Sequence, residues 1–451
     1  MVVTDSVQRK VHLVSLGCAR NRADSEVMLG TLALKNWAVT SEPESADAII
    51  INTCGFIGPA KEESVNTILE MAQYKSDNPS MKLVVAGCLT QRYKGQLVPG
   101  LPEVDLFVGT DEFPKVGEFL EDSLEPGTVK AKRTHYLYDG SLPKKNTLSK
   151  WSAYVKVAEG CQHNCAFCII PAIRGQLRSR PIPSVVSEVK SLVAEGVVEI
   201  NLIAQDLAAY GRDWGSSDLL PLLKALVDID GLRWIRLLYV YPENISEEFI
   251  EFFASNPKIV KYLDIPVQHA SNRILTKMNR DVTSIEIRNT VAKLRSRIPE
   301  IAIRTSVMVG FPGESREDFM ELRDFVEEMK FEHLGCFSYS QEEGTVAGRM
   351  QDQIDEDVKA ERQSEIMEIQ KEISKKNLES FVGKNLPVLV TGVSEETDLL
   401  LEGRLMTQAP EVDGIVYIND GDYKVGEIQN CLISETHDYD LVAAVLPAPD
   451  Q

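Results

Sequence analysis

The chain has 451 residues, which is long enough for two or three domains with separate hydrophobic cores. No apolar run approaches the roughly 20 residues that a membrane-spanning helix needs, and the amino terminus lacks the pattern of a signal peptide. We therefore expect a cytoplasmic protein with no membrane association. A formal net charge of −20 repels the phosphate backbone of nucleic acids, so we expect no stable nucleic-acid binding.

Short apolar runs dominate the first segment, residues 1–125. They span residues 11–16, 48–53 and 82–87, and each is followed by a turn and a helical stretch. This alternation is typical of an open parallel α/β sheet. The next segment, 126–150, carries Pro, Gly and several Lys and is predicted to be a linker.

A cysteine follows each of these three runs, beside a glycine at which the backbone can turn sharply. The cysteines are Cys18, Cys54 and Cys88. Ligands of open α/β sheets bind at the carboxyl ends of the strands, so three thiols far apart in sequence can converge on one site. We interpret them as the ligands of an iron–sulfur cluster. The alternative is three buried cysteines that act as small apolar side chains.

Residues 151–380 contain six further strand candidates, at 153–157, 199–203, 234–238, 262–265, 303–309 and 334–337. Helical stretches separate them, which predicts a partial (β/α) barrel of six parallel strands with its active site at the strand carboxyl ends. An amphipathic stretch at 356–380 is predicted to be a long helix that stops near Gly383.

Three cysteines with the spacing CxxxCxxC follow the first of these strands: Cys161, Cys165 and Cys168. Three thiolates leave one iron of a four-iron cluster without a protein ligand, and that iron can chelate S-adenosylmethionine (SAM). The pattern therefore indicates a radical SAM cluster. A zinc knuckle with His163 as fourth ligand is the alternative, although a ligand inside the same tight loop would be strained. We interpret His163 as a solvated loop residue.

Residues 381–451 carry short alternating strands at 386–390, 414–418 and 441–445, which predict a small antiparallel β-barrel. Three Lys/Arg stand against thirteen Asp/Glu here, a net charge of −10 that favours a basic protein partner. The segment has no cysteine triplet, so we expect its removal to leave both clusters intact. The predicted fold class is thus α/β: an open parallel α/β domain, a partial barrel and a small β-barrel.

Five segments of the chain match the signatures of one family. They are residues 15–21, 52–57 and 86–89, the triplet loop with 169–171 and Arg174-Gly175, and 310–314. Over nearly its full length the chain resembles the radical SAM methylthiotransferases. The resemblance implies a methylthiotransferase amino-terminal domain at 1–125, a radical SAM core at 151–380 and a TRAM domain at 381–451.

Within this family the chain is most similar to the enzymes that add a methylthio group to the β-carbon of an aspartate of small-subunit ribosomal protein S-twelve. The similarity lies in residues 239–242, 264–271 and 339–345. The sequence departs from that branch at Leu207-Ala208-Ala209 and at Gln341. The alternative is methylthiolation of a tRNA adenosine, which is the reaction of the other main branch.

The resemblance also implies cofactors and roles. It implies two [4Fe-4S] clusters, one on Cys161, Cys165 and Cys168 and an auxiliary one on Cys18, Cys54 and Cys88 that would hold the transferred sulfur. SAM would serve as co-substrate, both as methyl donor and as source of the radical that takes hydrogen from the aspartate. The expected partners are the ribosomal protein or small ribosomal subunit, and an electron donor such as flavodoxin or ferredoxin. The candidate SAM contacts are Phe167, Gln205, Asp206, Gln268, Arg304, Gly310, Gly313 and Glu314.

Overall fold

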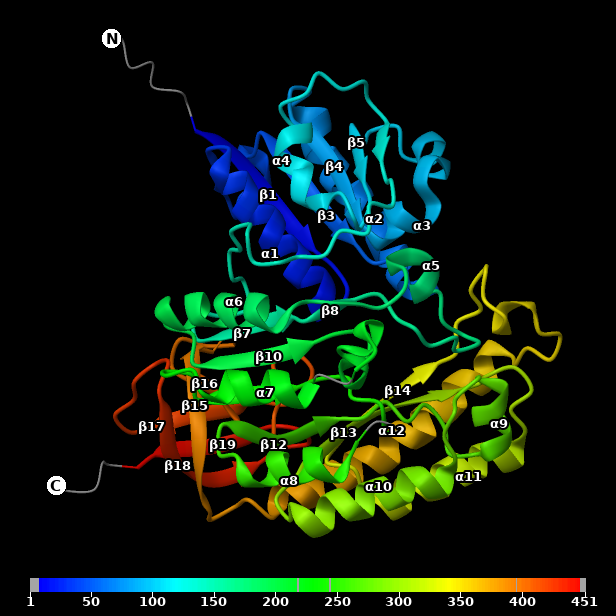
Figure 1. Cartoon of the computed structure of the whole chain (residues 1–451), viewed down its shortest axis with the longest axis vertical. Coiled ribbons are helices and arrows are strands. Elements are labelled where there is room, and N and C mark those ends of the chain that lie inside the picture. The colour runs from blue at the N-terminus through cyan, green and yellow to red at the C-terminus, as the bar shows by residue number, and fades with distance from the viewer. Residues whose placement is uncertain (1–7, 217–218, 243–244, 395, 447–451) are drawn as a thin grey trace.

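The computed structural model describes residues 8–216, 219–242, 245–394 and 396–446, which form three parts (Figure 1). An amino-terminal α/β part sits above a six-stranded barrel, and a small β-barrel packs against the opposite end of those strands. The predicted fold class is confirmed. Within the described residues, no helix is both long and apolar enough to cross a membrane.

The amino-terminal part is built on a six-stranded sheet in which every neighbouring pair is parallel, in the order β2-β1-β3-β4-β5-β6. The strands β3, β4 and β5 are buried on both faces, which explains their continuous apolar runs. One face packs on α1, and the other packs on α2 and α3. The elements are β1 (Arg9–Ser15), α1 (Ala19–Leu34), β2 (Trp37–Val39), β3 (Ala48–Thr53), α2 (Gly58–Asp77), β4 (Lys82–Gly87), α3 (Cys88–Tyr93), β5 (Leu106–Val108), α4 (Val116–Phe119) and β6 (Thr128–Lys130).

Three strands of this sheet escaped sequence reasoning: β2, β5 and β6. Each has three residues, too few for a periodic pattern to be recognised, and each is defined by pairing with a neighbour. The strand β6 lies inside the segment that we predicted to be a linker, so the amino-terminal sheet extends into it. The domain boundaries themselves stay a prediction.

The second part is an open barrel of six parallel strands in the order β14-β13-β12-β11-β10-β7, as predicted. Helix α12 runs along β14 and α11 (Figure 1). The strands are β7 (Ser152–Lys156), β10 (Glu199–Ile203), β11 (Trp234–Leu237), β12 (Ile259–Asp264), β13 (Ala302–Val309) and β14 (His333–Ser338), with a short pair β8 (Ala158–Glu159) and β9 (Arg178–Ser179). The helices are α5 (Ile170–Arg174), α6 (Ile182–Ala194), α7 (Leu219–Val227), α8 (Glu247–Ser255), α9 (Asn272–Lys277), α10 (Ser284–Arg297), α11 (Arg316–Met329) and α12 (Glu356–Glu379).

The third part is a closed five-stranded barrel in the order β15-β16-β17-β19-β18. Its strands are β15 (Asn385–Val393), β16 (Leu401–Leu405), β17 (Val416–Asp420), β18 (Ile428–Thr436) and β19 (Leu441–Val445). Sequence reasoning missed β16 and β18. The barrel is also not wholly antiparallel, because β17 and β19 pair in parallel.

Alternate residues of the large barrel's strands point into its interior, and there they meet the segment 406–414 of the small barrel. Tyr262 donates a hydrogen bond to Asp413 (2.7 Å), and Arg236 donates one to the carbonyl of Met406 (2.7 Å). The buried carboxylate of Glu199 pairs with Arg236 (3.0 Å) and with Arg404 (2.5 Å). The small barrel therefore plugs one end of the large one.

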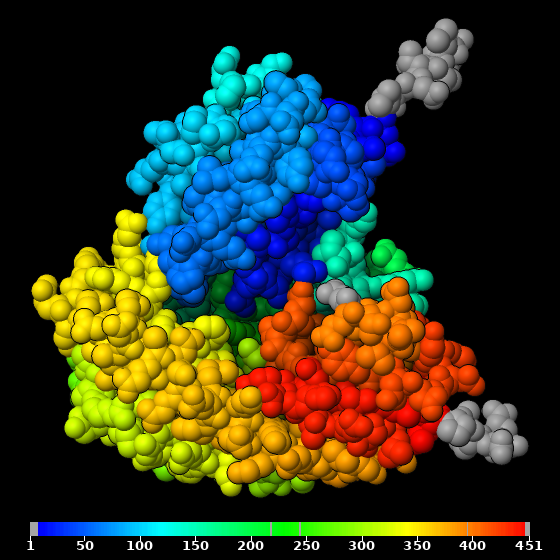
Figure 2. Space-filling view, turned by 180° about the vertical axis from the view of Figure 1, so that it is seen from behind, coloured from blue at the N-terminus to red at the C-terminus, as the bar shows by residue number. Residues whose placement is uncertain are grey.

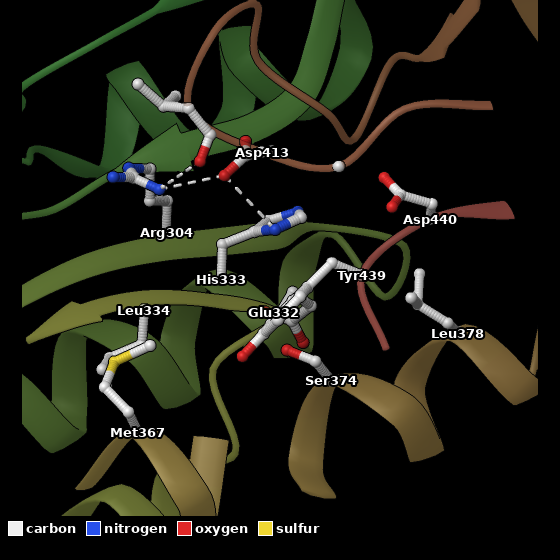
Figure 3. A pocket seen from close by; sticks show the side chains of 12 residues that line it. Arg304, Glu332, His333, Leu334, Met367, Ser374, Leu378, Asp413, Tyr439 and Asp440 are labelled. Atoms are coloured by element: carbon white, nitrogen blue, oxygen red, sulfur yellow. Dashed lines mark hydrogen bonds and ion pairs between the residues drawn. The ribbon is translucent and has the colours of Figure 1, made fainter. Parts of the chain in front are cut away.

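A pocket of about 400 Å³ lies at this junction (Figure 3). Arg304 and His333 point toward the carboxylate of Asp413, at 2.9 and 3.4 Å. None of the eight cysteines lines this pocket.

Candidate active site

The first three cysteines lie where strands of the amino-terminal sheet end. Cys18 precedes α1, Cys54 follows β3 and Cys88 begins α3. Their loops touch: a Cβ atom built on Gly17 would lie 3.3 Å from the Cys54 Sγ, and one on Gly55 would lie 2.9 Å from the carbonyl carbon of Cys88. The structure thus brings together Cys18, Cys54 and Cys88, which we predicted to converge because each follows a strand of the same sheet.

The second triplet forms a tight loop after β7 and β8. The Cys161 amide donates to the carbonyl of Gly175 (3.1 Å), and the Cys168 amide donates to that of Cys165 (3.0 Å). Two further backbone N–H groups, of His163 and Ile170, point at the sulfurs of Cys161 and Cys168 at 3.4 and 3.5 Å. Such donors stabilise sulfur that carries negative charge.

Burial dominates the acid–base behaviour of these thiols. Burial, together with the smaller effect of neighbouring thiols, raises the pKa of Cys54 and of Cys168 to about 12 and that of Cys161 to about 11. Burial acts in the same sense on Cys18, but the charges of Arg20 and Arg174 outweigh it and lower its pKa. All eight cysteines are free thiols. Two groups of three free thiols, partly buried, fit iron–sulfur clusters, whose iron would replace the thiol protons.

The zinc alternative finds no support in the geometry. The Nε2 atom of His163 lies 2.7 Å from Asp206, and its ring stacks on Tyr241 with the centroids 4.3 Å apart. Across the described residues, no group of three or more His, Cys, Asp or Glu side chains is placed to hold a single metal ion. The interpretation of His163 as a solvated loop residue is wrong, because Asp206 and Tyr241 hold its ring.

Arg174 joins the two triplet loops. It is buried at the end of α5 and donates to the Sγ of Cys88 (3.4 Å) and to Asn21 (2.7 Å) on the amino-terminal side. Its other nitrogen pairs with Asp24 (2.9 Å) and with Glu159 (3.1 Å), which lies two residues before Cys161. A buried arginine with this many partners fixes the relative position of both loops.

Two buried glutamines occupy the mouth of the barrel. Gln205 follows β10 and Gln268 follows β12, and each side chain is about 7% exposed. Among the described residues neither side-chain amide makes a hydrogen bond, and neither amide is fully enclosed, so both are open to a ligand at the barrel mouth. Gln268 and Tyr239 also adopt positive φ angles of 71° and 68°, a conformation that side chains other than glycine rarely take. Unpaired amides and backbone strain together mark a ligand-binding site.

Asp206 and Phe167, two further candidate SAM contacts, are held near the triplet loop. Asp206 accepts from His163 and from the backbone N–H of Ala208 (3.0 Å), so its carboxylate is already bonded. Phe167 is half-buried against an apolar cluster that includes Phe311 and Tyr339. Their role toward the cofactor stays a prediction.

The remaining four candidates are engaged within the protein. Arg304 pairs with Asp413 of the small barrel (2.9 Å), and Glu314 pairs with Arg362 (2.5 Å). A Cβ atom on Gly310 would lie 2.2 Å from Lys359, and one on Gly313 would lie 2.2 Å from Asp352 and Lys277. These two glycines therefore adopt positive φ angles in turns that pack tightly against neighbouring side chains. A contact between either glycine and adenosine stays a prediction.

Sequence reasoning missed five residues of this site: Arg20, Arg174, Tyr239, Tyr241 and Asp264. All five stand in the segments that carry the family resemblance, which was the available signal. Asp264 ends β12; burial raises its pKa to about 6 against the opposing charge of Arg304, and its Oδ1 atom has no hydrogen-bond partner. Figure 2 shows a recess where the amino-terminal part, the barrel and the small barrel meet.

Three known sequence families match separate parts of the chain. Residues 10–109 match the uncharacterized protein family UPF0004, residues 155–326 match the radical SAM superfamily, and residues 382–446 match the TRAM domain. The order and extent of these matches follow the three structural parts.

Two solved structures are similar in fold. The radical SAM methyltransferase TsrM from Kitasatospora setae, with tryptophan and a SAM analogue bound, has a TM-score of 0.53 at 17% identity, over 73% of this chain and 72% of that chain. The cobalamin-dependent SAM radical enzyme OxsB, with aqua-cobalamin and SAM bound, has a TM-score of 0.53 at 12% identity, over 80% and 56%. At these identities the likeness concerns the fold alone.

Curated relatives are similar over the whole chain. The ribosomal protein uS12 methylthiotransferase RimO of Geotalea uraniireducens is 48% identical, over 99% of this chain and all of that protein. The enzymes of the same name from Geobacter sulfurreducens and Bdellovibrio bacteriovorus are 48% and 47% identical, and both alignments cover at least 97% of each chain. The chain therefore belongs to the ribosomal protein uS12 methylthiotransferase family of radical SAM enzymes.

Proposed function

We propose that this enzyme adds a methylthio group to the β-carbon of an aspartate of ribosomal protein uS12. The observation that carries the proposal is the pair of thiol triplets on facing loops, joined by Arg174, in a chain that matches uS12 methylthiotransferases from end to end. Its action on a ribosomal protein places the enzyme in the cytoplasm.

The cysteine side chains divide into two cluster sites. Cys161, Cys165 and Cys168 hold one [4Fe-4S] cluster, and Cys18, Cys54 and Cys88 hold the other. When bound, the clusters and SAM supply the electron, the carbon-centred radical and the sulfur that the reaction needs. A flavodoxin or ferredoxin delivers the electron from outside.

The chain's own residues bind SAM, orient the two cluster loops and limit the access of water. The unpaired amides of Gln205 and Gln268 are available to the polar groups of SAM at the barrel mouth, and Phe167 adds an apolar surface beside the triplet loop. Arg174 keeps the two cluster loops at a fixed distance. Removal of hydrogen by the SAM radical and transfer of sulfur from the auxiliary site can then act on the same substrate carbon. Cys88, Cys161 and Cys165 are buried, which limits the access of bulk water to these three thiols.

The small barrel contributes negative charge toward a basic substrate, but only part of its acidic residues is available. Asp413 is buried in the ion pairs of the barrel interior, and Glu411 pairs with Arg22 (2.5 Å). Asp420, Asp422 and Glu435 are exposed. These exposed carboxylates attract a lysine-rich ribosomal protein, and they would repel tRNA.

Mass spectrometry of the isolated small ribosomal subunit tests the proposal. A strain that lacks this gene should yield uS12 without the methylthio group, the wild-type gene should restore it, and a Cys88→Ala gene should not. The tRNA of the same strains is digested and its nucleosides analysed in parallel. Unmodified uS12 in every strain, together with a methylthio-adenosine that depends on the gene, would overturn the proposal in favour of the tRNA reaction.

A further inference from the structure

Arg20 is a charged side chain without a carboxylate partner at the centre of the site. It lies in the first turn of α1, two residues after Cys18, and reaches across to the barrel. Its Nη1 atom donates to the carbonyl of Ala204 at the end of β10 (2.8 Å), and its guanidinium lies over the ring of Tyr239 at 5.2 Å. The Nε atom is buried and has no hydrogen-bond partner.

The neighbouring arginines behave differently. Arg22, on the same helix, pairs with Glu411 (2.5 Å), and Arg174 pairs with Asp24 (2.9 Å). Buried arginines are almost always paired in this way, because an uncompensated charge away from water is costly. Among the described residues no carboxylate lies within ion-pair distance of Arg20. Asp264, a carboxylate near it, accepts instead from the backbone N–H of Tyr239 (3.1 Å).

The position of Arg20 is between the two cluster sites. It stands two residues after Cys18 of the amino-terminal triplet, and the Ala204 carbonyl to which it donates directly precedes Gln205 at the mouth of the barrel. Any substrate atom that reacts with both sites must therefore pass close to this guanidinium. A negatively charged group that binds there would face this guanidinium, which has no carboxylate partner among the described residues and an unpaired Nε atom.

The aspartate side chain of the substrate has this charge at the right place. Its carboxylate is bonded directly to the β-carbon that is modified, so it must enter the space between the two sites with the reacting atom. A carboxylate in a site shielded from water needs a cation, and a guanidinium offers it two parallel N–H donors. We propose that Arg20 binds the side-chain carboxylate of the substrate aspartate and so selects aspartate as the residue to be modified. This inference rests on the proposed function.

Two other roles for Arg20 make different predictions. If it bound the carboxylate of SAM, its loss would impair SAM binding and cleavage in the absence of substrate. If it only neutralised a cluster, its loss would change iron content or cluster spectra. Arg174 and the backbone N–H groups serve the sulfurs of Cys88, Cys161 and Cys168. Arg20 faces the Cys18 thiol, but its Nε atom has no hydrogen-bond partner and is available to a ligand.

The test uses the full chain with reconstituted clusters in four forms: wild type, Arg20→Gln, Arg20→Lys and the matched control Arg22→Gln. Two probes are compared, uS12 and uS12 with its target aspartate replaced by asparagine. Dissociation constants, methylthio transfer, iron content, cluster spectra and SAM cleavage without uS12 are measured for each form.

Arg20→Gln should weaken binding of uS12 roughly 10- to 100-fold, the usual worth of a hydrogen bond to a charged group. It should bind the asparagine probe as the wild type does, so that the preference for aspartate disappears. Arg20→Lys should restore most of the preference, because it keeps the charge. Arg22→Gln should resemble the wild type, and iron content, spectra and substrate-free SAM cleavage should be equal in all four forms.

The inference is overturned if Arg20→Gln binds uS12 as tightly as the wild type, or weakens both probes equally. It is also overturned if the variant loses SAM cleavage or iron, which would assign Arg20 to the cofactor or to a cluster. A wild-type enzyme that cleaves SAM yet leaves uS12 unmodified would remove the proposed function, and this inference with it.

Discussion

Arg404→Ala removes one arginine from a buried carboxylate that ties the small barrel to the large one. Glu199 on β10 has no exposed surface and accepts from Arg404 (2.5 Å), Arg236 (3.0 Å) and Ser152 (2.7 Å). Burial alone would raise its pKa, yet the two arginines lower it from 4.5 to about 2. The variant leaves that negative charge with a single arginine in an environment without water.

Two lines of reasoning give the expected magnitude. A pKa difference of about 2.5 corresponds to about 3 kcal/mol of interaction with the charged form. Removing one partner of a buried ion pair typically costs 3–5 kcal/mol. We therefore expect Arg404→Ala to lower the free energy of local opening at β10 and β16 by about 3 kcal/mol. Lys424→Ala, at the exposed pair with Glu427 (3.7 Å), is the control and should cost less than about 1 kcal/mol.

Hydrogen exchange with mass spectrometry, in increasing urea, measures this opening separately for each element. The pH dependence is a second readout: because the folded pKa of Glu199 is depressed, its contribution is complete above pH 4.5 and is lost as pH falls toward 2. A Glu199→Gln variant should lack that loss. Equal protection of β10 in Arg404→Ala and in the control would refute the view that the small barrel is an integral plug.

Further expectations concern the cysteines and Asp264. The reconstituted enzyme should bind about eight irons, and Cys161→Ala and Cys88→Ala should each remove about half; loss of all iron from a folded single variant would contradict two independent sites. Replacing Cys18, Cys54 and Cys88 together by alanine should abolish methylthio transfer while SAM cleavage to 5′-deoxyadenosine continues, and loss of cleavage with the barrel cluster still visible would disprove that division. Burial raises the pKa of Asp264 from 3.8 to about 6, so the stability that it contributes is complete below pH 3.8 and is lost as pH rises through 6. At pH 8 the free energy of unfolding, measured in urea, should therefore be higher for Asp264→Asn than for the wild type, by up to about 3 kcal/mol. If the two proteins differ in stability by the same amount at pH 4 and at pH 8, the pKa of Asp264 is not raised.

The sequence by itself determined the features that are encoded locally. Apolar runs of five residues or more gave the long strands of both large sheets, because a strand buried on both faces must be apolar throughout. The spacing within 161–168 defined one thiol triplet, and the position of Cys18, Cys54 and Cys88 at strand ends predicted that they converge. Each of these features depends on a few neighbouring residues or on one topological rule.

Only the tertiary structure decided what depends on residues far apart in the chain. Arg20 and Arg174 acquire their roles because α1 and α5 come from different parts and face each other across the two triplets. The contacts of segment 406–414 could not be found from the sequence, since its partners Arg236 and Tyr262 lie 170 and 151 residues earlier, on strands of the large barrel. The three-residue strands β2, β5 and β6 exist because neighbouring strands supply their hydrogen bonds. Long-range pairing of this kind leaves no local pattern, so sequence reasoning could not find it.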